Sequence, residues 1–540
     1  MVNNNGHQKR IILANVKIPY PLASMYLKAV ALTDSDISQN CEIIIKRYSG
    51  GQDETLIVSD IVTQNPVIVG FSCYLWNINQ VLKISQLLKA RLPNVIIILG
   101  GPEVTPRAED ILHNNSSIDI IVRGEGEITF KELVRVCLFS DKGLKDIEGI
   151  TFRDGVAIIS TKDRTLIDDL DTLPMVYHDS IYRDFYKATF PELITLETSR
   201  GCPFKCKFCA WPFQGRKMRF FSLERMEKDF ASLAQQNKDI SLYFADSDLL
   251  MDKERAKPII NLLKKYFSDK AYFCIETNPD NLDKEALELV NNPRFILVLG
   301  LQTINPEAQK CYGRTLDVEK LNGLVTYLRE KGDDFHSPML LFSMVLGLPE
   351  DTYEWFKETL DFILSLGFSL NYYFFISHLL SLPGSQFDRE SAKYGLVFEA
   401  AAPHRLISSN TFSKKDIARA NVLSYYVTFL QSQPDLRNTL FNIGNLLKDK
   451  VKRPYLSAYE NVIALLQKRN LLRGNGAYKQ NITYSGYSFT SLPRNDFMAS
   501  VKVLMAEYES DIVNRYYSRR SGIPTYSGDR ICQVCRQRRP

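Results

Sequence analysis

The chain has no long apolar run. No stretch of roughly 18 uncharged apolar residues occurs among its 540 residues, so a membrane-spanning helix is not expected. The polar segment 1–10 lacks the apolar run that a signal peptide needs, which predicts a cytoplasmic protein. The net charge of +5 is small for this length, so we expect no nucleic-acid partner.

Histidine is scarce, with six residues, whereas cysteine occurs ten times. In a chain expected to be cytoplasmic, these thiols should be reduced or bind a metal rather than form disulfides. The length exceeds what one ordinary hydrophobic core supports, which predicts two or three domains. A content of 45% hydrophobic and 24% charged residues is typical of a globular protein.

Short apolar runs alternate with amphipathic segments over residues 1–140, which predicts an α/β domain. The runs are apolar at nearly every position, so both faces of the sheet should be buried, as in a parallel sheet. We therefore predict a Rossmann-like, doubly wound sheet of five parallel strands, with ligands bound beyond the carboxyl ends of the strands. The predicted strands are Ile11–Val16, Cys41–Tyr48, Pro66–Cys73, Asn94–Gly101 and Ile118–Arg123.

A second series of apolar runs fills residues 191–400, after a connector at 141–190. The connector contains a predicted hairpin, Ile150–Ile159, which turns at Asp154-Gly155. Six runs that each end in polar or glycine residues predict an open six-stranded (β/α)6 partial barrel, with its functional groups at the carboxyl ends. The predicted strands are Leu193–Thr198, Ser241–Ala245, Tyr272–Glu276, Phe295–Gly300, Leu340–Leu346 and Leu370–Ile376.

The last part of the chain, 401–540, is predicted to be a mostly helical domain and tail, with Lys414–Gln431 and Tyr455–Lys468 as its clearest helices. Near its end, Cys532 and Cys535 have metal-ligand spacing but no partner pair. They could form a redox pair, complete a site with other residues, or lie in a solvated tail.

Three cysteines directly after the first barrel strand are the strongest chemical signal: Cys202-x-x-x-Cys206-x-x-Cys209. Three thiolates at this spacing can hold three irons of a [4Fe–4S] cluster and leave the fourth iron open. The open iron can chelate the methionine part of S-adenosylmethionine (SAM), and one electron then releases a 5′-deoxyadenosyl radical. The alternative is a zinc site, which needs a fourth ligand, but no histidine lies between His178 and His336.

The cysteine motif resembles that of the radical SAM superfamily, and the resemblance implies further SAM contacts. Phe208 matches the aromatic residue near the adenine, and Gly347 matches the glycine turn beside it. Asp246 and Ser247 match the segment that holds the SAM amino group, although Asp246-Ser247-Asp248 departs from the common Gly-Gly-Glu form. The residues that match ribose or carboxylate contacts are Glu276 and Gln302.

The first domain resembles the cobalamin-binding domain that is joined to many radical SAM enzymes. The resemblance lies in Gly70-Phe71-Ser72, Gly100-Gly101-Pro102-Glu103 and Arg123-Gly124-Glu125-Gly126-Glu127. The Asp-x-His-x-x-Gly motif is missing, so cobalamin should bind base-off and without a histidine ligand. The alternative is a vestigial sheet that binds no cofactor. The residues expected to contact cobalamin are Ser72, Tyr74, Trp76, Gly100, Gly101, Gly124 and Gly126.

Arg200 and the basic run Gly215–Phe221 flank the cysteine loop. They could bind a carboxylate of SAM or substrate. Alternatively, they form a solvated loop with Phe220 and Phe221 in the core. Together with other segments, the run from Met218 to Arg225 resembles a subgroup of this family that carries a C-terminal domain of unknown function.

These features favour a cobalamin-dependent radical SAM methyltransferase that acts on an unactivated carbon. A second hypothesis is a radical cyclisation, rearrangement or other radical step without methyl transfer. A third is a non-enzymatic iron–sulfur or zinc protein. The expected partners of the enzyme are a small-molecule or peptide substrate and an electron donor such as flavodoxin or ferredoxin.

Overall fold

The computed structural model describes residues 8–140, 143–178, 193–210, 215–331, 337–367, 372–431 and 433–468. The tail cysteines Cys532 and Cys535 lie outside these ranges. None of the helices in them is long and apolar enough to cross a membrane. The chain divides into two compact units, one of Met1–Tyr353 and Leu370–Ile417, the other of Glu354–Ser369 and Ala418–Pro540.

The first sheet begins with five parallel strands in the order β2-β1-β3-β4-β5. Alternate residues of these strands enter two separate apolar clusters, one on each face of the sheet. This explains why the strands are apolar throughout rather than at every second position. The strands are β1 (Lys9–Val16), β2 (Cys41–Tyr48), β3 (Ile68–Ser72), β4 (Ile96–Gly100) and β5 (Ile120–Val122).

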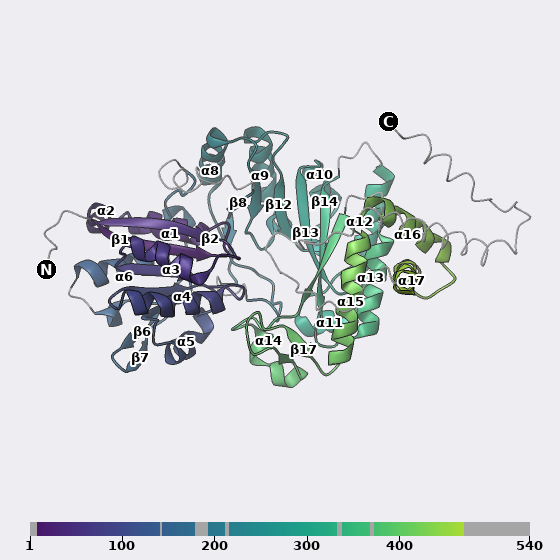
Figure 1. The fold of residues 1–540 in the computed structure, drawn as a ribbon. Coiled ribbons are helices and arrows are strands. Elements are labelled where there is room, and N and C mark those ends of the chain that lie inside the picture. Colours follow the sequence, from purple (N-terminus) through teal and green to yellow (C-terminus); the bar gives the residue numbers. More distant parts are fainter. Residues whose placement is uncertain are drawn as a thin grey trace, which may run out of the picture. The chain divides into compact units, whose positions relative to one another are not determined.

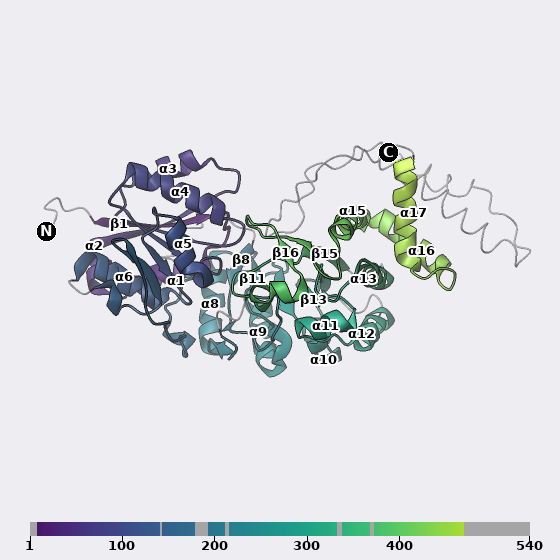
Figure 2. The ribbon, with the colours of Figure 1, turned by 90° about the horizontal axis from the view of Figure 1, so that it is seen from below.

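Helices cover both faces of this sheet, as a doubly wound fold requires. Apolar residues of α3, α4 and α5 belong to one cluster, and residues of α2 and α6 belong to the other. Figure 2 shows α3 and α4 on one side of the purple strands and α6 on the opposite side. The helices are α1 (Leu22–Ala31), α2 (Ser35–Asn40), α3 (Glu54–Thr63), α4 (Ile78–Arg91), α5 (Ala108–Asn114) and α6 (Glu127–Phe139).

The sheet has seven strands, which corrects the prediction of five. The hairpin β6 (Ile150–Asp154) and β7 (Ala157–Ser160), which the sequence assigned to the connector, pairs antiparallel with β5. Gly155 has φ +63°, and the turn is formed by Gly155-Val156, one residue after the predicted Asp154-Gly155. The hairpin covers the backbone groups that β5 would otherwise expose at the sheet edge.

A second sheet contains six parallel strands in the order β15-β14-β13-β12-β11-β8 (Figure 1). Along β11 and β12 buried residues alternate with partly exposed ones, so one face is covered and the other is open. The strands are β8 (Leu193–Leu196), β11 (Ser241–Phe244), β12 (Phe273–Thr277), β13 (Phe295–Gln302), β14 (Met339–Leu346) and β15 (Tyr372–His378). The helices between them in this unit are α8 (Leu223–Gln236), α9 (Lys253–Tyr266), α10 (Lys284–Leu289), α11 (Pro306–Tyr312) and α12 (Val318–Lys331).

Two short antiparallel pairs were not expected from the sequence. The first joins β9 (Ser199–Arg200) to β10 (Arg219–Phe220) and brackets the cysteine loop. The second joins β16 (Val397–Phe398) to β17 (Leu406–Ser408). Strands of two or three residues leave too short an apolar run to be read from a sequence.

In the second unit, helix α17 (Pro454–Lys468) begins beside α13 (Tyr353–Ser365). Arg453 donates hydrogen bonds to Glu354 and Glu358, and the Leu456 amide donates to Asp361 over 2.7 Å. Burial raises the pKa of Asp361 to about 6. The unit also contains α16 (Pro434–Leu447), which packs on α17, and most of α15 (Lys414–Gln431).

Candidate active site

The polar residues after β11 and β12 divide between the two faces of the second sheet. Ser247 and Glu276 are partly exposed and share the open face, whereas Asp246 and Asp248 are buried on the covered face. Side chains two residues apart share a face, so Ser247 continues the partly exposed row of Tyr243. Of the three residues in this segment, Ser247 is therefore the one directed into the open side of the barrel.

Asp246 joins the end of β11 to the end of β8. It is 2% exposed, and its carboxylate accepts hydrogen bonds from the Thr198 amide at 3.0 Å, the Thr198 hydroxyl at 2.7 Å and the Ser199 hydroxyl. Burial raises the pKa of this carboxyl, and the three hydrogen bonds oppose the rise. The carboxylate of Asp246 therefore joins two strand ends. Its contact with the SAM amino group stays a prediction.

Asp248 joins the end of β11 to the end of β12 in the same manner. Its buried carboxylate accepts three hydrogen bonds of 2.7 to 2.9 Å, and burial raises its pKa despite them. The two aspartates thus hold three adjacent strand ends together. The donors to Asp248 are the Thr277 hydroxyl, the Asn278 amide and the Asn281 side chain.

On the open face, Ser247 and Glu276 offer a hydroxyl and a carboxyl. The Ser247 hydroxyl lies 3.9 Å from the sulfur of Met218, in the segment that returns from the cysteine loop. Glu276 accepts a hydrogen bond from the Tyr243 hydroxyl. Burial raises the pKa of Glu276, and the Tyr243 hydrogen bond lowers it in part.

Gln302 and Gly347 lie at the ends of β13 and β14, where the sequence predicted adenosine contacts. Gln302 follows a β-bulge, has φ +64°, and buries a side-chain oxygen that has no hydrogen-bond partner among the described residues. Gly347 has φ +91°, and a Cβ there would lie 2.4 Å from the Leu406 side chain. Gly347 is therefore favoured by its positive φ, whatever it contacts in SAM.

The base of the cysteine loop is closed by backbone contacts. Gly201 has φ +105°, and a Cβ on it would lie 2.4 Å from the carbonyl oxygen of Lys217. The Cys202 amide donates to the carbonyl of Gly215 over 3.2 Å. Both contacts join the residues just after β9 to those just before β10.

The other end of the loop lies against α11. The Lys207 amide donates to the Tyr312 carbonyl over 2.9 Å, and the Phe208 ring meets the Tyr312 ring edge-on at 5.4 Å. The Cys209 amide donates to the Cys206 carbonyl over 3.2 Å. Phe208, predicted to lie near the adenine, is thus oriented by Tyr312, the buried last residue of α11.

The donor chemistry of the three cysteines fits an iron–sulfur cluster. Burial raises the pKa of the Cys206 thiol, and the positive charge of Arg314 opposes this rise. Across the described ranges, no three histidine, cysteine, aspartate or glutamate side chains are placed to hold one metal ion between them. In a [4Fe–4S] cluster each thiolate binds a different iron, so the fit rests on three thiols in one short loop.

The glycines predicted to approach cobalamin fall into three kinds. Gly101 has φ +114°, and a Cβ there would lie 2.5 Å from the Cys73 carbonyl oxygen, so it is required by the fold itself. At Gly100 the nearest neighbours of a Cβ would lie at 3.8 Å, and at Gly124 none lies within 4 Å. Gly126 is intermediate, with neighbours at 3.4 and 3.5 Å. Gly100 and Gly124 therefore leave the open space that a bound ligand needs.

The loop after β3 is shaped by Asn77, which the sequence did not single out. Its buried side chain donates to the carbonyls of Val16 and Ser72 at 2.9 Å and accepts from the Tyr74 amide at 2.8 Å. The rings of Tyr74 and Trp76 stack at 4.5 Å. The loop predicted to lie beneath the corrin is therefore fixed by one amide side chain.

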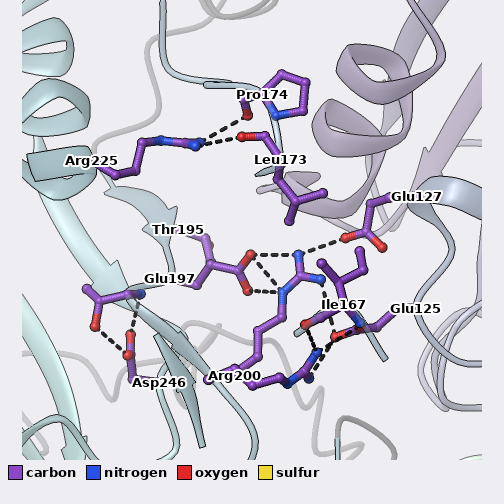
Figure 3. Close-up of polar contacts among 12 residues, drawn as sticks. Glu125, Glu127, Ile167, Leu173, Pro174, Thr195, Glu197, Arg200, Arg225 and Asp246 are labelled. Atoms are coloured by element: carbon purple, nitrogen blue, oxygen red, sulfur yellow. Dashed lines mark hydrogen bonds and ion pairs between the residues drawn. The ribbon is translucent and has the colours of Figure 1, made fainter. Parts of the chain in front are cut away.

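The largest surprise is a buried ion network between the loop after β5 and the residues next to the cysteine loop (Figure 3). Arg200 binds Glu197, Glu127 and Glu125, at 2.8, 2.7 and 3.3 Å, and Arg219 binds Glu125 at 2.8 Å. Arg200 is 5% exposed and Arg219 is 4% exposed. Arg200 thus binds carboxylates of the protein itself. The sequence predicted that it either binds a carboxylate of SAM or substrate or lies in a solvated loop, and the structure corrects both predictions for this residue.

The aromatic pair after Arg219 also differs from its prediction. Phe221 is buried, as expected for a core residue, but Phe220 is exposed. The guanidinium of Arg255 lies 4.7 Å from the centre of the Phe220 ring. The prediction that both rings lie in the core is therefore wrong for Phe220.

A second polar contact joins the loop after β4 to the β16–β17 hairpin. Buried Glu103 pairs with Arg107 and lies 3.7 Å from His404, and the Asn79 side chain donates to the Ala402 carbonyl over 3.3 Å. Burial raises the pKa of Glu103, and the charge of Arg107 opposes this. This contact comes from the segments after β3 and β4, whereas the Arg200 network comes from the loop after the neighbouring strand β5.

Two family models match the chain: the B12 binding domain over residues 20–134 and the radical SAM superfamily over residues 196–363. A similar curated protein is the uncharacterized methyltransferase PH0819 of Pyrococcus horikoshii, 27% identical over 351 residues, which are 64% of this chain and 73% of that protein. Another is the cobalamin-dependent radical SAM methyltransferase TokK of Streptomyces tokunonensis, 30% identical over 190 residues. That match covers 34% of this chain and 28% of TokK.

Among solved structures, the chain resembles the cobalamin-dependent SAM radical enzyme OxsB with aqua-cobalamin and SAM bound. The TM-score is 0.62, with 16% identity, and the match covers 98% of this chain and 83% of OxsB. At this identity the likeness establishes a shared α/β fold.

Proposed function

Because the chain belongs to the radical SAM superfamily and also carries a B12-binding domain, we propose that it transfers a methyl group to an unactivated carbon of a small molecule. The observation that carries this proposal is the joint presence of a three-cysteine loop and the open glycine loops of β4 and β5 in one compact unit. The cofactors are a [4Fe–4S] cluster, SAM and cobalamin. When bound, the cluster supplies the electron that cleaves SAM to a 5′-deoxyadenosyl radical, and cobalamin supplies the methyl group.

In the barrel, Cys202, Cys206 and Cys209 would hold three irons as thiolates. Ser247 and Glu276 stand on the open face and would receive the polar groups of SAM there. Asp246, on the covered face, would hold the ends of β8 and β11 together through its hydrogen bonds to Thr198. These roles follow from which face each side chain occupies.

The unpartnered oxygen of Gln302 supports a further SAM contact. A buried amide oxygen without a donor costs about 1–3 kcal/mol, which a ligand N–H or O–H would recover. Phe208, held edge-on by Tyr312, would present its ring to the adenine. Gly347 would contact the adenosine only through its backbone.

In the first domain, Gly100, Gly101, Gly124 and Gly126 would let the backbone approach the corrin. The stacked pair Tyr74 and Trp76, with Ser72, would lie beneath it, and that loop contains no histidine. We therefore propose base-off cobalamin without a histidine ligand.

His404, which lies beside the β4 loop, already has protein neighbours at both ring nitrogens. Its Nδ1 lies 3.1 Å from the Glu399 carbonyl and its Nε2 lies 3.4 Å from Arg107. These contacts support the proposal that it does not coordinate cobalt.

The test uses the purified, anaerobically reconstituted protein with added hydroxocobalamin. We expect stoichiometric binding and a base-off cob(II)alamin electron paramagnetic resonance signal without nitrogen hyperfine splitting. We also expect 5′-deoxyadenosine from SAM. SAM cleavage without cobalamin binding would reject methyl transfer and favour a radical reaction of another kind. Failure of SAM cleavage would leave a non-enzymatic metal protein.

Several finer predictions belong to the same proposal. Flavodoxin or ferredoxin would be the electron donor. The domain boundaries near residues 140, 190 and 400, and the narrower likeness to the subgroup with a C-terminal domain of unknown function, also stay predictions.

A further inference from the structure

The base of the cysteine loop brings two positive charges together. In the β9–β10 ladder, Arg200 stands directly opposite Arg219. Like charges directly opposite each other in an antiparallel pair are destabilising. Both residues are almost fully buried, so water cannot screen the repulsion. Another group must therefore compensate these charges if the loop is to stay closed at its base.

Glu125 occupies that position, and it comes from the first domain. Its carboxylate accepts hydrogen bonds from the two terminal nitrogens of Arg219 at 3.0 and 2.8 Å and from Arg200 at 3.3 Å. The Ile167 amide donates to the same carboxylate over 2.9 Å. Figure 3 shows Glu125 beside Arg200 and Ile167. It is the one carboxylate among the described contacts that pairs with both arginines.

The charge state of Glu125 agrees with this role. Burial alone would raise its pKa, but the hydrogen bond from Arg219 and the charge of Arg200 outweigh burial and hold the pKa below its ordinary value. Glu125 is therefore ionised at neutral pH and can neutralise the pair. The remaining contacts of Arg200, to Glu127 and Glu197, do not reach Arg219.

We propose that Glu125 is a positioning residue for the iron–sulfur loop. By compensating Arg200 and Arg219 at the base of that loop, it makes retention of the cluster depend on docking of the first domain. Arg200 lies two residues before Cys202, so a shift of β9 moves a cluster ligand directly. The inference rests on the cluster ligands of the proposed function but not on methyl transfer.

The test adds a chelator to the reconstituted holoenzyme. The rate of iron release is measured from the loss of the visible absorbance of the cluster. Glu125→Gln keeps the size and loses the charge, and it should release iron at least about tenfold faster, equivalent to about 1.4 kcal/mol. The matched control is Glu132→Gln, a first-domain glutamate that pairs with Arg164 outside the network. It should release iron at the wild-type rate. Equal rates for Glu125→Gln and wild type would overturn the proposal.

A charge-balanced double variant separates this role from general damage. Glu125→Gln with Arg219→Gln removes the repulsion together with its compensation, so iron release should slow back toward the wild-type rate. A double variant that is no slower than Glu125→Gln would overturn the proposal. Should Glu125→Gln fail to fold by circular dichroism, Glu125→Asp keeps the charge but shortens its reach. It should release iron faster than wild type, and an equal rate would overturn the proposal.

Cobalamin content, measured in the same samples, distinguishes failure of the proposed methyl transfer from failure of the proposed role of Glu125. Missing cobalamin in the wild type would reject methyl transfer, while the iron-release comparison would still decide the role of Glu125.

Discussion

Replacing Gly101 with alanine tests whether the β4 loop needs glycine for folding or for its ligand. The residue has φ +114°, a conformation that costs a non-glycine residue about 1–3 kcal/mol. The new Cβ would also lie 2.5 Å from the carbonyl oxygen and 3.0 Å from the amide nitrogen of Cys73. Both atoms belong to the backbone, which cannot move aside as a flexible side chain does.

The overlap adds about 1–3 kcal/mol, a typical cost of overpacking, so Gly101→Ala should lose about 2–6 kcal/mol of unfolding free energy. Urea unfolding of the first sheet, followed by circular dichroism, measures this loss. An unfolding midpoint equal to that of the wild type would refute the reasoning, because the close approach to Cys73 would then be relieved without cost.

Gly100→Ala is the matched comparison. Its Cβ would have neighbours no closer than 3.8 Å, so stability should stay within about 0.5 kcal/mol of the wild type. If the corrin approaches this backbone, the added methyl should weaken cobalamin binding about tenfold or more, or about 1.4 kcal/mol. Stable Gly100→Ala protein with unchanged cobalamin affinity would remove Gly100 from the ligand site.

Three further predictions concern the barrel. Cys206→Ala should lose the cluster by iron analysis, whereas Cys137→Ala should keep it, and normal iron in the first variant would contradict the ligand assignment. Asp246→Asn should lower unfolding free energy by about 1–3 kcal/mol, since an amide N–H₂ would face a hydrogen-bond donor; weaker SAM binding at unchanged stability would instead favour the ammonium contact. Asp351, which follows β14, is 2% exposed, and burial raises its pKa to about 7. This carboxyl alone should therefore lower stability by up to about 4 kcal/mol as pH rises from about 4 to 7. Asp351→Asn should remove that contribution in thermal unfolding measured across the range, while other buried carboxyls such as Asp361 keep theirs, and an unchanged pH profile would contradict the prediction.

The strands of the first sheet were predictable because they are buried on both faces and therefore apolar at almost every position. The strands of the second sheet are also apolar runs, although alternate residues face its open side. Runs such as Cys41–Tyr48 and Leu340–Leu346 match observed strands to within one residue. The hairpin turn at Gly155 was equally visible, because a two-residue turn with positive φ favours glycine. The pairing of this hairpin with β5 could not be predicted, because the sequence of a hairpin does not indicate which sheet edge it will pair with.

The alternation of side chains along a strand relates the residues after β11 to the open face. Strand residues alternate between faces, so the partly exposed Tyr243 places Ser247 on its own side and Asp246 on the other. The resemblance to the radical SAM superfamily pointed to Asp246 and Ser247 for the SAM amino group. Alternation would have added that its carboxylate lies among the strand ends, where Thr198 and Ser199 donate to it.

Long-range ion pairs could not be predicted in this way. Glu125, in the loop after β5, and Arg200, in β9, are 75 residues apart, and no local pattern relates them. The family resemblance of the segment Arg123–Glu127 rests on its glycines. Adjacent residues of this segment have different roles. Gly124 leaves open space and Glu125 closes the base of the cysteine loop. Gly124 has φ +75°, so Gly124→Ala also strains the backbone of this loop. It should impair cobalamin binding with the cluster intact, and Glu125→Gln should do the reverse. Because the two residues are adjacent, loss of both cofactors in each variant would mean that the segment acts only as a structural support.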